Sequence, residues 1–153
     1  MPRIRPEECA ALDVEWYAVD SQGNIAVFCS AGEGSLPEFV CEDAGRTDVL
    51  AEYFAGREIT SGSVLLVHRP ARAAQVAREF SGRGLYYFDA DDGTGAEVCA
   101  LRTYYTKQAY PQKPLRYGQL PEHIRQLLGR QVLQTENFAL ADTILVKHAY
   151  HNT

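Results

Sequence analysis

The sequence predicts an α+β domain, in which a mainly antiparallel sheet built from hairpins carries about three packed helices. Three observations support this class. Pairs of apolar segments are joined by turn-forming residues, which is typical of β-hairpins. Amphipathic segments bounded by helix-capping residues lie between them. Strands and helices do not alternate regularly, which disfavours a parallel sheet built from βαβ units.

A chain of 153 residues is expected to form a single domain over residues 1–153. Residues 1–11 contain two prolines and four charges, so we expect an irregular lead-in. Within it, Pro6, Glu7 and Glu8 suit the first turn of a short helix. Residues 151–153 are expected to fray.

The best-defined element is a hairpin within residues 12–40. Residues 14–20 alternate between two faces, with Trp16 and Ala18 on one and Tyr17 and Val19 on the other. Residues 21–24 offer Gly and Asn for a turn, and the apolar residues 25–29 form the return strand. Whether Trp16 lies in the core or is exposed stays open.

Two helices with a strand between them are predicted next. Residues 43–55 and 70–80 carry apolar stripes at helical spacing, and residues 62–68 hold an apolar run that suits a buried strand. The expected core faces are Val49, Leu50, Tyr53 and Phe54 on the first helix, and Ala73, Val76, Ala77 and Phe80 on the second.

The second half of the chain predicts another hairpin, a short helix and a final strand. Strands at 85–89 and 97–106 are joined by the turn-forming residues 90–95. Residues 107–118 contain two prolines and are expected to cross over irregularly. Pro121 opens a helix that runs to residue 128. The pattern is strand-like from residue 131, and residues 144–146 suit the last core strand.

Composition and residue spacing restrict the cell compartment and the cofactors that we expect for this protein. There is no apolar segment of the length of a signal peptide or a membrane span, so we expect a cytoplasmic protein with no membrane association. The four cysteines lack CxxC spacing and are expected to be small buried hydrophobes. The acids from Asp89 to Asp92 do not have the spacing of a calcium loop, and His148 and His151 would face opposite sides of a strand. No metal or cofactor is predicted.

Negative charge is concentrated in residues 31–56, which contain six acids and one base. Such a surface repels phosphate, so nucleic-acid binding is disfavoured, whereas a protein partner with a basic surface is favoured. Aromatic side chains near the acids would act as anchors. The candidate partner-binding residues are Glu33, Glu38, Glu42, Asp43, Asp48, Glu52 and Tyr17.

A catalytic alternative centres on the loop from Gly32 to Gly34, which follows an apolar strand. A small hydrolase or transferase would use Cys29 or the carboxylates around this loop, in a pocket lined by Cys29, Ser30, Glu33 and a histidine. The loop itself lacks the third glycine and the lysine of a phosphate-binding loop. Because no complete catalytic constellation is present, the sequence favours a protein without catalysis.

The first hairpin and its loop resemble a group of small bacterial immunity-type proteins. The resemblance covers about a third of the chain and includes a Pro-rich segment at 105–121. It implies binding to a co-encoded toxin and no catalytic residue. The leading hypothesis is therefore a binding module that neutralises a toxin by occlusion, in an oligomeric state left open. The positions that carry the resemblance are Asp13, Glu15, Trp16, Tyr17, Val19, Asp20, Gly23, Ile25, Ser30, Gly32, Gly34, Leu36 and Pro37.

Overall fold

The computed structural model describes residues 3–9, 12–32, 34–90 and 103–150. Its fold is α+β, as the sequence predicts. The helices are α1 (Pro6–Cys9), α2 (Glu38–Cys41), α3 (Ala44–Ala55), α4 (Ala71–Gly82), α5 (Glu122–Leu128) and a 3₁₀ turn at Tyr117–Gln119. The strands are β1 (Glu15–Asp20), β2 (Ile25–Cys29), β3 (Ser63–Leu65), β4 (Tyr86–Asp89), β5 (Tyr104–Pro111), β6 (Val132–Leu133) and β7 (Thr143–Leu145).

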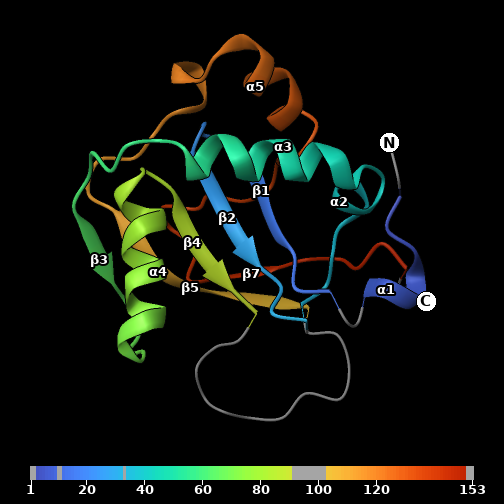
Figure 1. The fold of residues 1–153 in the computed structure, drawn as a ribbon, viewed down its shortest axis with the longest axis horizontal. Helices are drawn as coiled ribbons and strands as arrows, with labels where there is room; N and C mark the ends of the chain where they lie inside the picture. Colours follow the sequence, from blue (N-terminus) through green and yellow to red (C-terminus); the bar gives the residue numbers. More distant parts are fainter. Residues whose placement is uncertain (1–2, 10–11, 33, 91–102, 151–153) are drawn as a thin grey trace.

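All these strands belong to one mixed sheet, with the order β3-β5-β4-β2-β1-β6. β7 pairs with β5 on the same edge as β3, opposite β4, because Thr106 pairs with both Asp89 and Thr143. Most pairs are antiparallel, but β2 and β4 run parallel, as do β1 and β6. The sheet therefore joins the first hairpin to the second half of the chain through a parallel contact at its centre (Figure 1).

The predicted first hairpin is present and closes through a tight polar turn. Gly23 adopts a φ of +79°, which L side chains rarely adopt. The buried Asp20 carboxylate accepts hydrogen bonds from the backbone N–H of Gln22 and Asn24 and from the Asn24 side chain. It also accepts one from the backbone N–H of Phe138, at 2.7 Å. Asp20 thus fixes the turn and anchors a segment more than a hundred residues away.

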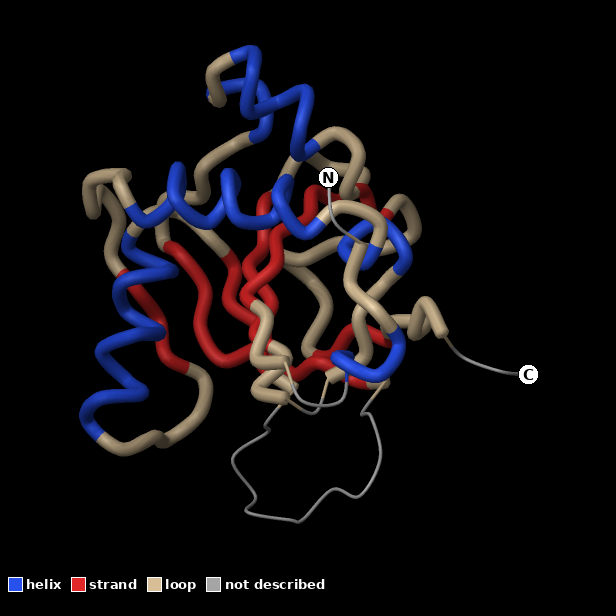
Figure 2. The backbone as a smooth tube through the Cα atoms, turned by 45° about the vertical axis from the view of Figure 1, so that its right-hand side comes forward, coloured by secondary structure: helices blue, strands red, loops and turns tan. Residues whose placement is uncertain are grey.

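One face of the sheet carries an aromatic core. Trp16 is fully buried and stacks on Phe28 with ring centroids 4.1 Å apart, and Phe28 stacks on Phe88 at 5.1 Å. Its indole N–H also donates to the Tyr105 hydroxyl at 3.2 Å. The cover on this face consists of α1, of residues 34–41 with α2, and of the segments on either side of β7, at 138–142 and 146–150 (Figure 2). Trp16 is therefore a core residue.

The other face of the sheet is covered by helices. α3 crosses β1, α4 lies over β3, β4 and β5, and α5 packs on α3 (Figure 1). The Tyr17 ring stacks on Phe54 of α3, with centroids 4.8 Å apart. Because alternate residues of β1 and β2 enter the two cores, both faces of this hairpin are buried.

The helices α3, α4 and α5 form where the sequence predicts them, whereas α2 is not predicted, and the buried faces of α3 and α4 differ in part from the prediction. Asp43 caps α3 by accepting a hydrogen bond from the Arg46 backbone N–H. Leu50 and Phe54 are buried as expected, whereas Val49 is 42% exposed. On α4, Ala77 is buried as expected, whereas Val76 is 39% exposed, and the other buried residues are the small Ala74, Ser81 and Gly82. Small side chains let α4 approach the sheet closely, which apolarity alone does not reveal.

The irregular crossover predicted for residues 107–118 is wrong in its first part, because β5 extends to Pro111. β4 pairs with one edge of β5, and β3 and β7 pair with the other, so long-range hydrogen bonds override weak local strand preference. Lys107 is buried here; its ammonium donates to the Ala139 carbonyl and lies 5.5 Å from the Tyr86 ring centroid. The predicted buried strand is the half-buried edge strand β3. Residues 91–102, which include most of the predicted second turn, lie outside the described residues.

We expect Asp20→Ala to lower the free energy of unfolding by about 3 kcal/mol, because it leaves buried donors without an acceptor. Urea unfolding monitored by tryptophan fluorescence measures this, since Trp16 is the sole tryptophan. The exposed Asp48→Ala is the control and should change the value by less than about 0.5 kcal/mol. Equal stability of both variants would contradict the anchoring role of Asp20.

Candidate functional site

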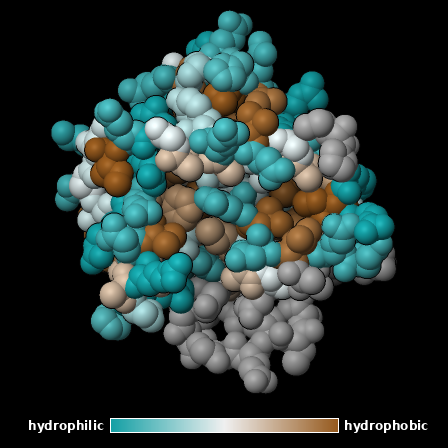
Figure 3. Space-filling model, in the orientation of Figure 1, coloured by the Kyte–Doolittle hydropathy of each residue, from teal (hydrophilic) through white to brown (hydrophobic). Residues whose placement is uncertain are grey.

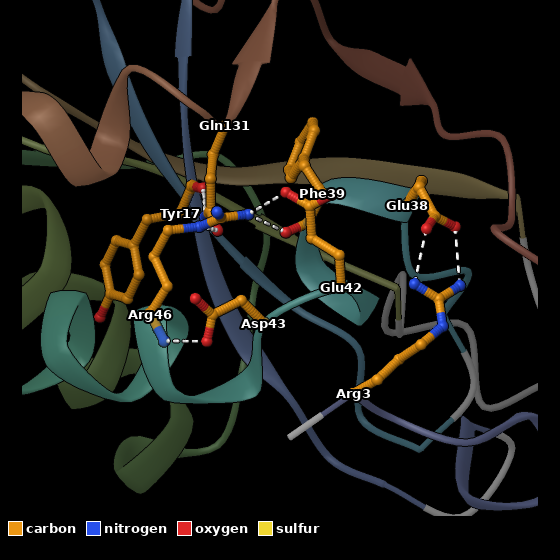
Figure 4. Close-up of polar contacts among 8 residues, drawn as sticks. All are labelled: Arg3, Tyr17, Glu38, Phe39, Glu42, Asp43, Arg46 and Gln131. Carbon is orange, nitrogen blue, oxygen red and sulfur yellow. Dashed lines mark hydrogen bonds and ion pairs between the residues drawn. The ribbon is translucent and has the colours of Figure 1, made fainter. Parts of the chain in front are cut away.

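Several predicted partner-binding acids are engaged within the chain. Glu38 forms an exposed ion pair with Arg3 at 2.6 Å, and hydrogen bonds from this guanidinium hold the pKa of the Glu38 carboxyl below its usual value (Figure 4). Glu42 pairs with Arg46 at 2.8 Å, and Asp43 serves as the helix cap. These three carboxylates are therefore less available to a partner than the sequence suggests.

Arg46 joins α2, α3 and the segment before β6 (Figure 4). Its side chain is 4% exposed. The guanidinium donates to the Gln131 side chain at 3.0 Å, to the Phe39 carbonyl and to Glu42. Gln131 in turn donates to the Tyr17 carbonyl at 2.6 Å. The one base in the acidic segment is thus a structural residue, not part of a solvated face.

The sequence predicts Tyr17 as a partner-binding residue, whereas the structure buries it in the core. The residue is 1% exposed, because the alternation of β1 directs its ring beneath α3. Only its hydroxyl reaches the edge of the core, where it donates to Glu15 at 2.7 Å. Burial, and next the Glu15 charge, raise the pKa of this phenol. Glu33 lies outside the described residues.

A groove of about 740 Å³ runs between the N-terminal segment with α1, the start of β1 and one side of α3. In Figure 3, hydrophobic residues reach the surface in this region and hydrophilic residues surround them. We call this feature the α1–α3 groove. It is lined by Arg3, Ile4, Arg5, Glu8, Leu12, Asp13, Val14, Glu15, Ala44, Thr47, Asp48 and Ala51.

The charges in the α1–α3 groove are unevenly compensated. Its two arginines are engaged: Arg3 with Glu38, and Arg5 with the glutamates of α1. Asp13, Glu15 and Asp48 form no ion pair with any described residue. Asp13 accepts a hydrogen bond from the Ala31 backbone N–H at 3.1 Å, and Glu15 accepts one from Tyr17. The groove therefore retains an excess of negative charge beside apolar walls.

Thr47 adds an unused hydrogen-bonding group to the groove. The residue is 5% exposed, and its Oγ1 has no hydrogen-bond partner within the described part of the chain. A buried hydroxyl without a partner costs about 1–3 kcal/mol. Buried polar groups are usually satisfied by a protein group or an ordered water, and a ligand can take the place of that water. The groove can therefore offer three carboxylates and one hydroxyl to a ligand.

Of the predicted partner-binding residues that the structure describes, only Asp48 lines the groove. Glu52 is exposed one helical turn further along α3, outside the groove. Asp13, Glu15 and Thr47 are not among the residues that the sequence predicts to bind a partner. One signal was present: Asp13 and Glu15 lie at the start of the first strand at alternate positions, which places both side chains on the same face.

The catalytic alternative gains no base from the described residues. Cys29 is half-buried between Glu15 and Asp89 on the neighbouring strands. Burial and these carboxylates raise the pKa of its thiol, which disfavours the nucleophilic thiolate. Ser30 accepts from the Val14 N–H at 2.7 Å and donates to the Leu12 carbonyl. His148 interacts with Leu36 instead of Cys29.

The loop glycines have a structural explanation. Gly32 has a φ of +73°, and a Cβ on Gly34 would collide with the Tyr105 side chain. Across the described ranges, His, Cys, Asp and Glu side chains nowhere form a group of three that could hold a metal ion. None of the described helices combines the length and apolarity that crossing a membrane requires.

Comparisons with known proteins give no match to this chain. No family model, no curated protein and no solved structure matches this chain. Function must therefore be argued from the groove itself.

We expect Arg46→Ala to lower the free energy of unfolding by about 2–3 kcal/mol, because Gln131 and the Phe39 carbonyl lose their donor. Chemical denaturation measures the change. Arg72→Ala on the exposed side of α4 is the matched control and should alter stability by less than about 0.5 kcal/mol. A similar small loss in both variants would show that Arg46 does not hold these elements together.

Thr47→Val should raise the free energy of unfolding by about 1 kcal/mol. Valine keeps the shape and the branched Cβ of threonine while removing a buried hydroxyl that lacks a partner. Thermal and urea unfolding both measure this. A destabilised variant would mean that Oγ1 has a partner in solution, and would remove the hydroxyl from the groove's binding groups.

Proposed function

We propose that this protein is a non-catalytic binding module that takes a basic segment of a protein partner into the α1–α3 groove. The observation that carries this proposal is the set of three carboxylates, on Asp13, Glu15 and Asp48, that form no ion pair within the described part of the chain. Carboxylates that remain unpaired in a groove favour a cationic ligand and speed its association.

The lining of the groove favours lysine or arginine side chains over other cations. Ile4, Leu12 and Val14 supply apolar surface, on which the aliphatic stems of these side chains can pack. Their charged ends would meet the carboxylates, and an N–H group would donate to Thr47 Oγ1. The volume lies within the range of about 300–1,000 Å³ that is typical of small-ligand pockets. The groove thus suits a short segment better than a broad, flat surface.

The partner class that we propose is a toxin encoded beside this protein. The resemblance of the first hairpin to immunity-type proteins supports this choice, and the acidic groove supports a basic toxin surface. Inhibition would follow from occlusion: a segment held in the groove cannot reach its own target. This mechanism requires no reaction from the immunity protein, in keeping with the raised pKa of the Cys29 thiol.

Charge reversal tests the groove with a defined probe. Isothermal titration calorimetry with an oligo-arginine peptide at low salt should show binding to the wild-type chain. Asp13→Lys with Asp48→Lys should weaken it by about tenfold or more, since each reversal removes an attraction and adds a repulsion. Glu52→Lys, on the same helix but outside the groove, should change affinity by less than about twofold. Equal weakening in both variants would indicate non-specific charge attraction.

The toxin partner is tested in cells. Co-expression with the product of the adjacent gene should restore growth that this product alone arrests, and the double groove variant should fail to restore it. Glu52→Lys should protect as well as the wild type. An adjacent gene without toxicity, or protection that survives the groove variant, would overturn the toxin proposal.

A further inference from the structure

Cys9 and Cys41 come together under the N-terminal segment. Cys9 ends α1 and Cys41 ends α2, and both residues are at most 1% exposed within one apolar cluster. The Ile4 backbone N–H donates to the Cys41 carbonyl at 2.9 Å, which holds the N-terminal segment against α2. The Cys9 thiol donates to the Arg5 carbonyl at 3.5 Å and the Cys41 thiol to the Leu36 carbonyl at 3.9 Å, and each thiol lies near enough to the other to influence its pKa. They are therefore neighbours in space although 32 positions separate them in sequence.

We propose that Cys9 and Cys41 form a redox modification site, which closes to a disulfide by exchange with a low-molecular-weight disulfide such as oxidised glutathione. The inference does not depend on the proposed binding function. It rests on the proximity of the two thiols, on the hydrogen bond that holds Ile4 against Cys41, and on the shared burial of the elements that carry them.

The exchange balances in two steps. The Cys9 thiolate attacks one sulfur of glutathione disulfide, which forms a mixed disulfide and releases one glutathione thiolate. The Cys41 thiolate then attacks the Cys9 sulfur, which forms the protein disulfide and releases the second glutathione. The two electrons lost by the protein reduce the glutathione disulfide, and the two thiol protons pass to the released glutathiones.

The surroundings make this reaction slow at neutral pH. Burial raises the pKa of both thiols, that of Cys41 to about 12, so that thiolate is scarce. Attack by an external disulfide also requires a transient opening of α1, a helix of four residues. We therefore expect a reduced resting state, with a rate of closure that rises about tenfold per pH unit below the thiol pKa.

Cys29 is the contrasting case within the same chain. It is more exposed than either partner of the pair, but its thiol contacts the Tyr87 hydroxyl and lies between the carboxylates of Glu15 and Asp89. These charges oppose both thiolate formation and the approach of anionic glutathione. Among the three described cysteines, exposure alone would favour Cys29 as the site of oxidation, whereas the proximity of two thiols favours Cys9 and Cys41.

The disulfide would act on the wall of the α1–α3 groove. Residues 3–8 supply four of its lining side chains, and α2 leads directly into α3, which supplies the opposite wall. A covalent bond between α1 and α2 would therefore fix one wall relative to the other. It would also restrict the unfolded chain and raise the unfolding temperature.

The test incubates the reduced full-length protein with oxidised glutathione at mildly alkaline pH. Intact mass should fall by about 2 Da, and non-reducing peptide mapping should join the peptides that contain Cys9 and Cys41. Cys29→Ser should give the same cross-linked peptide, whereas Cys9→Ser and Cys41→Ser should not. The oxidised wild type should melt at a higher temperature than the reduced protein, and a reductant should reverse the shift.

The wild-type peptide map decides the question even where a serine variant fails to fold. A bond that joins a different pair of cysteines would overturn the inference. So would a glutathione adduct that persists on one cysteine, or an unchanged mass after prolonged oxidation at alkaline pH.

Discussion

The structure depends on the burial of both faces of the β1–β2 hairpin. Trp16 and Tyr17 are adjacent in sequence, yet each is at most 1% exposed, in two different cores. A two-faced sheet must be covered on both sides, so helices α3, α4 and α5 cover one face, and α1, α2 and the C-terminal segment cover the other. The α1–α3 groove lies at the start of β1, between the N-terminal segment with α1 and one side of α3.

Polar groups in this fold divide into those that hold the layers together and those left at the groove. Asp20 and Arg46 are both buried, and each links segments that are distant in sequence. Three of the five described acids of the negative segment serve as a cap or as ion-pair partners. The carboxylates of the groove differ because the neighbouring arginines are already engaged. The local imbalance of charge, more than the total, gives this surface its preference for a cation.

The sequence was sufficient for the fold class and for most elements, because those depend on local patterns. The alternation in β1, the turn at Gly23 and the cap at Asp43 can all be read within a few residues. The extent of β5 and the burial of Lys107 could not, since both arise from pairing with strands distant in sequence. The groove was largely missed for the same reason: Asp13, Thr47 and Arg5 lie on three separate segments.

The central claim is that a basic segment binds in the α1–α3 groove. The most direct measurement is an NMR titration of the ¹⁵N-labelled protein with an oligo-arginine peptide. The largest amide shifts should fall on the residues that line the groove, such as Asp13, Thr47 and Asp48, and added salt should diminish them. Equal shifts on every acidic surface, with Glu79 and Glu122 affected as much as the groove, would contradict the claim.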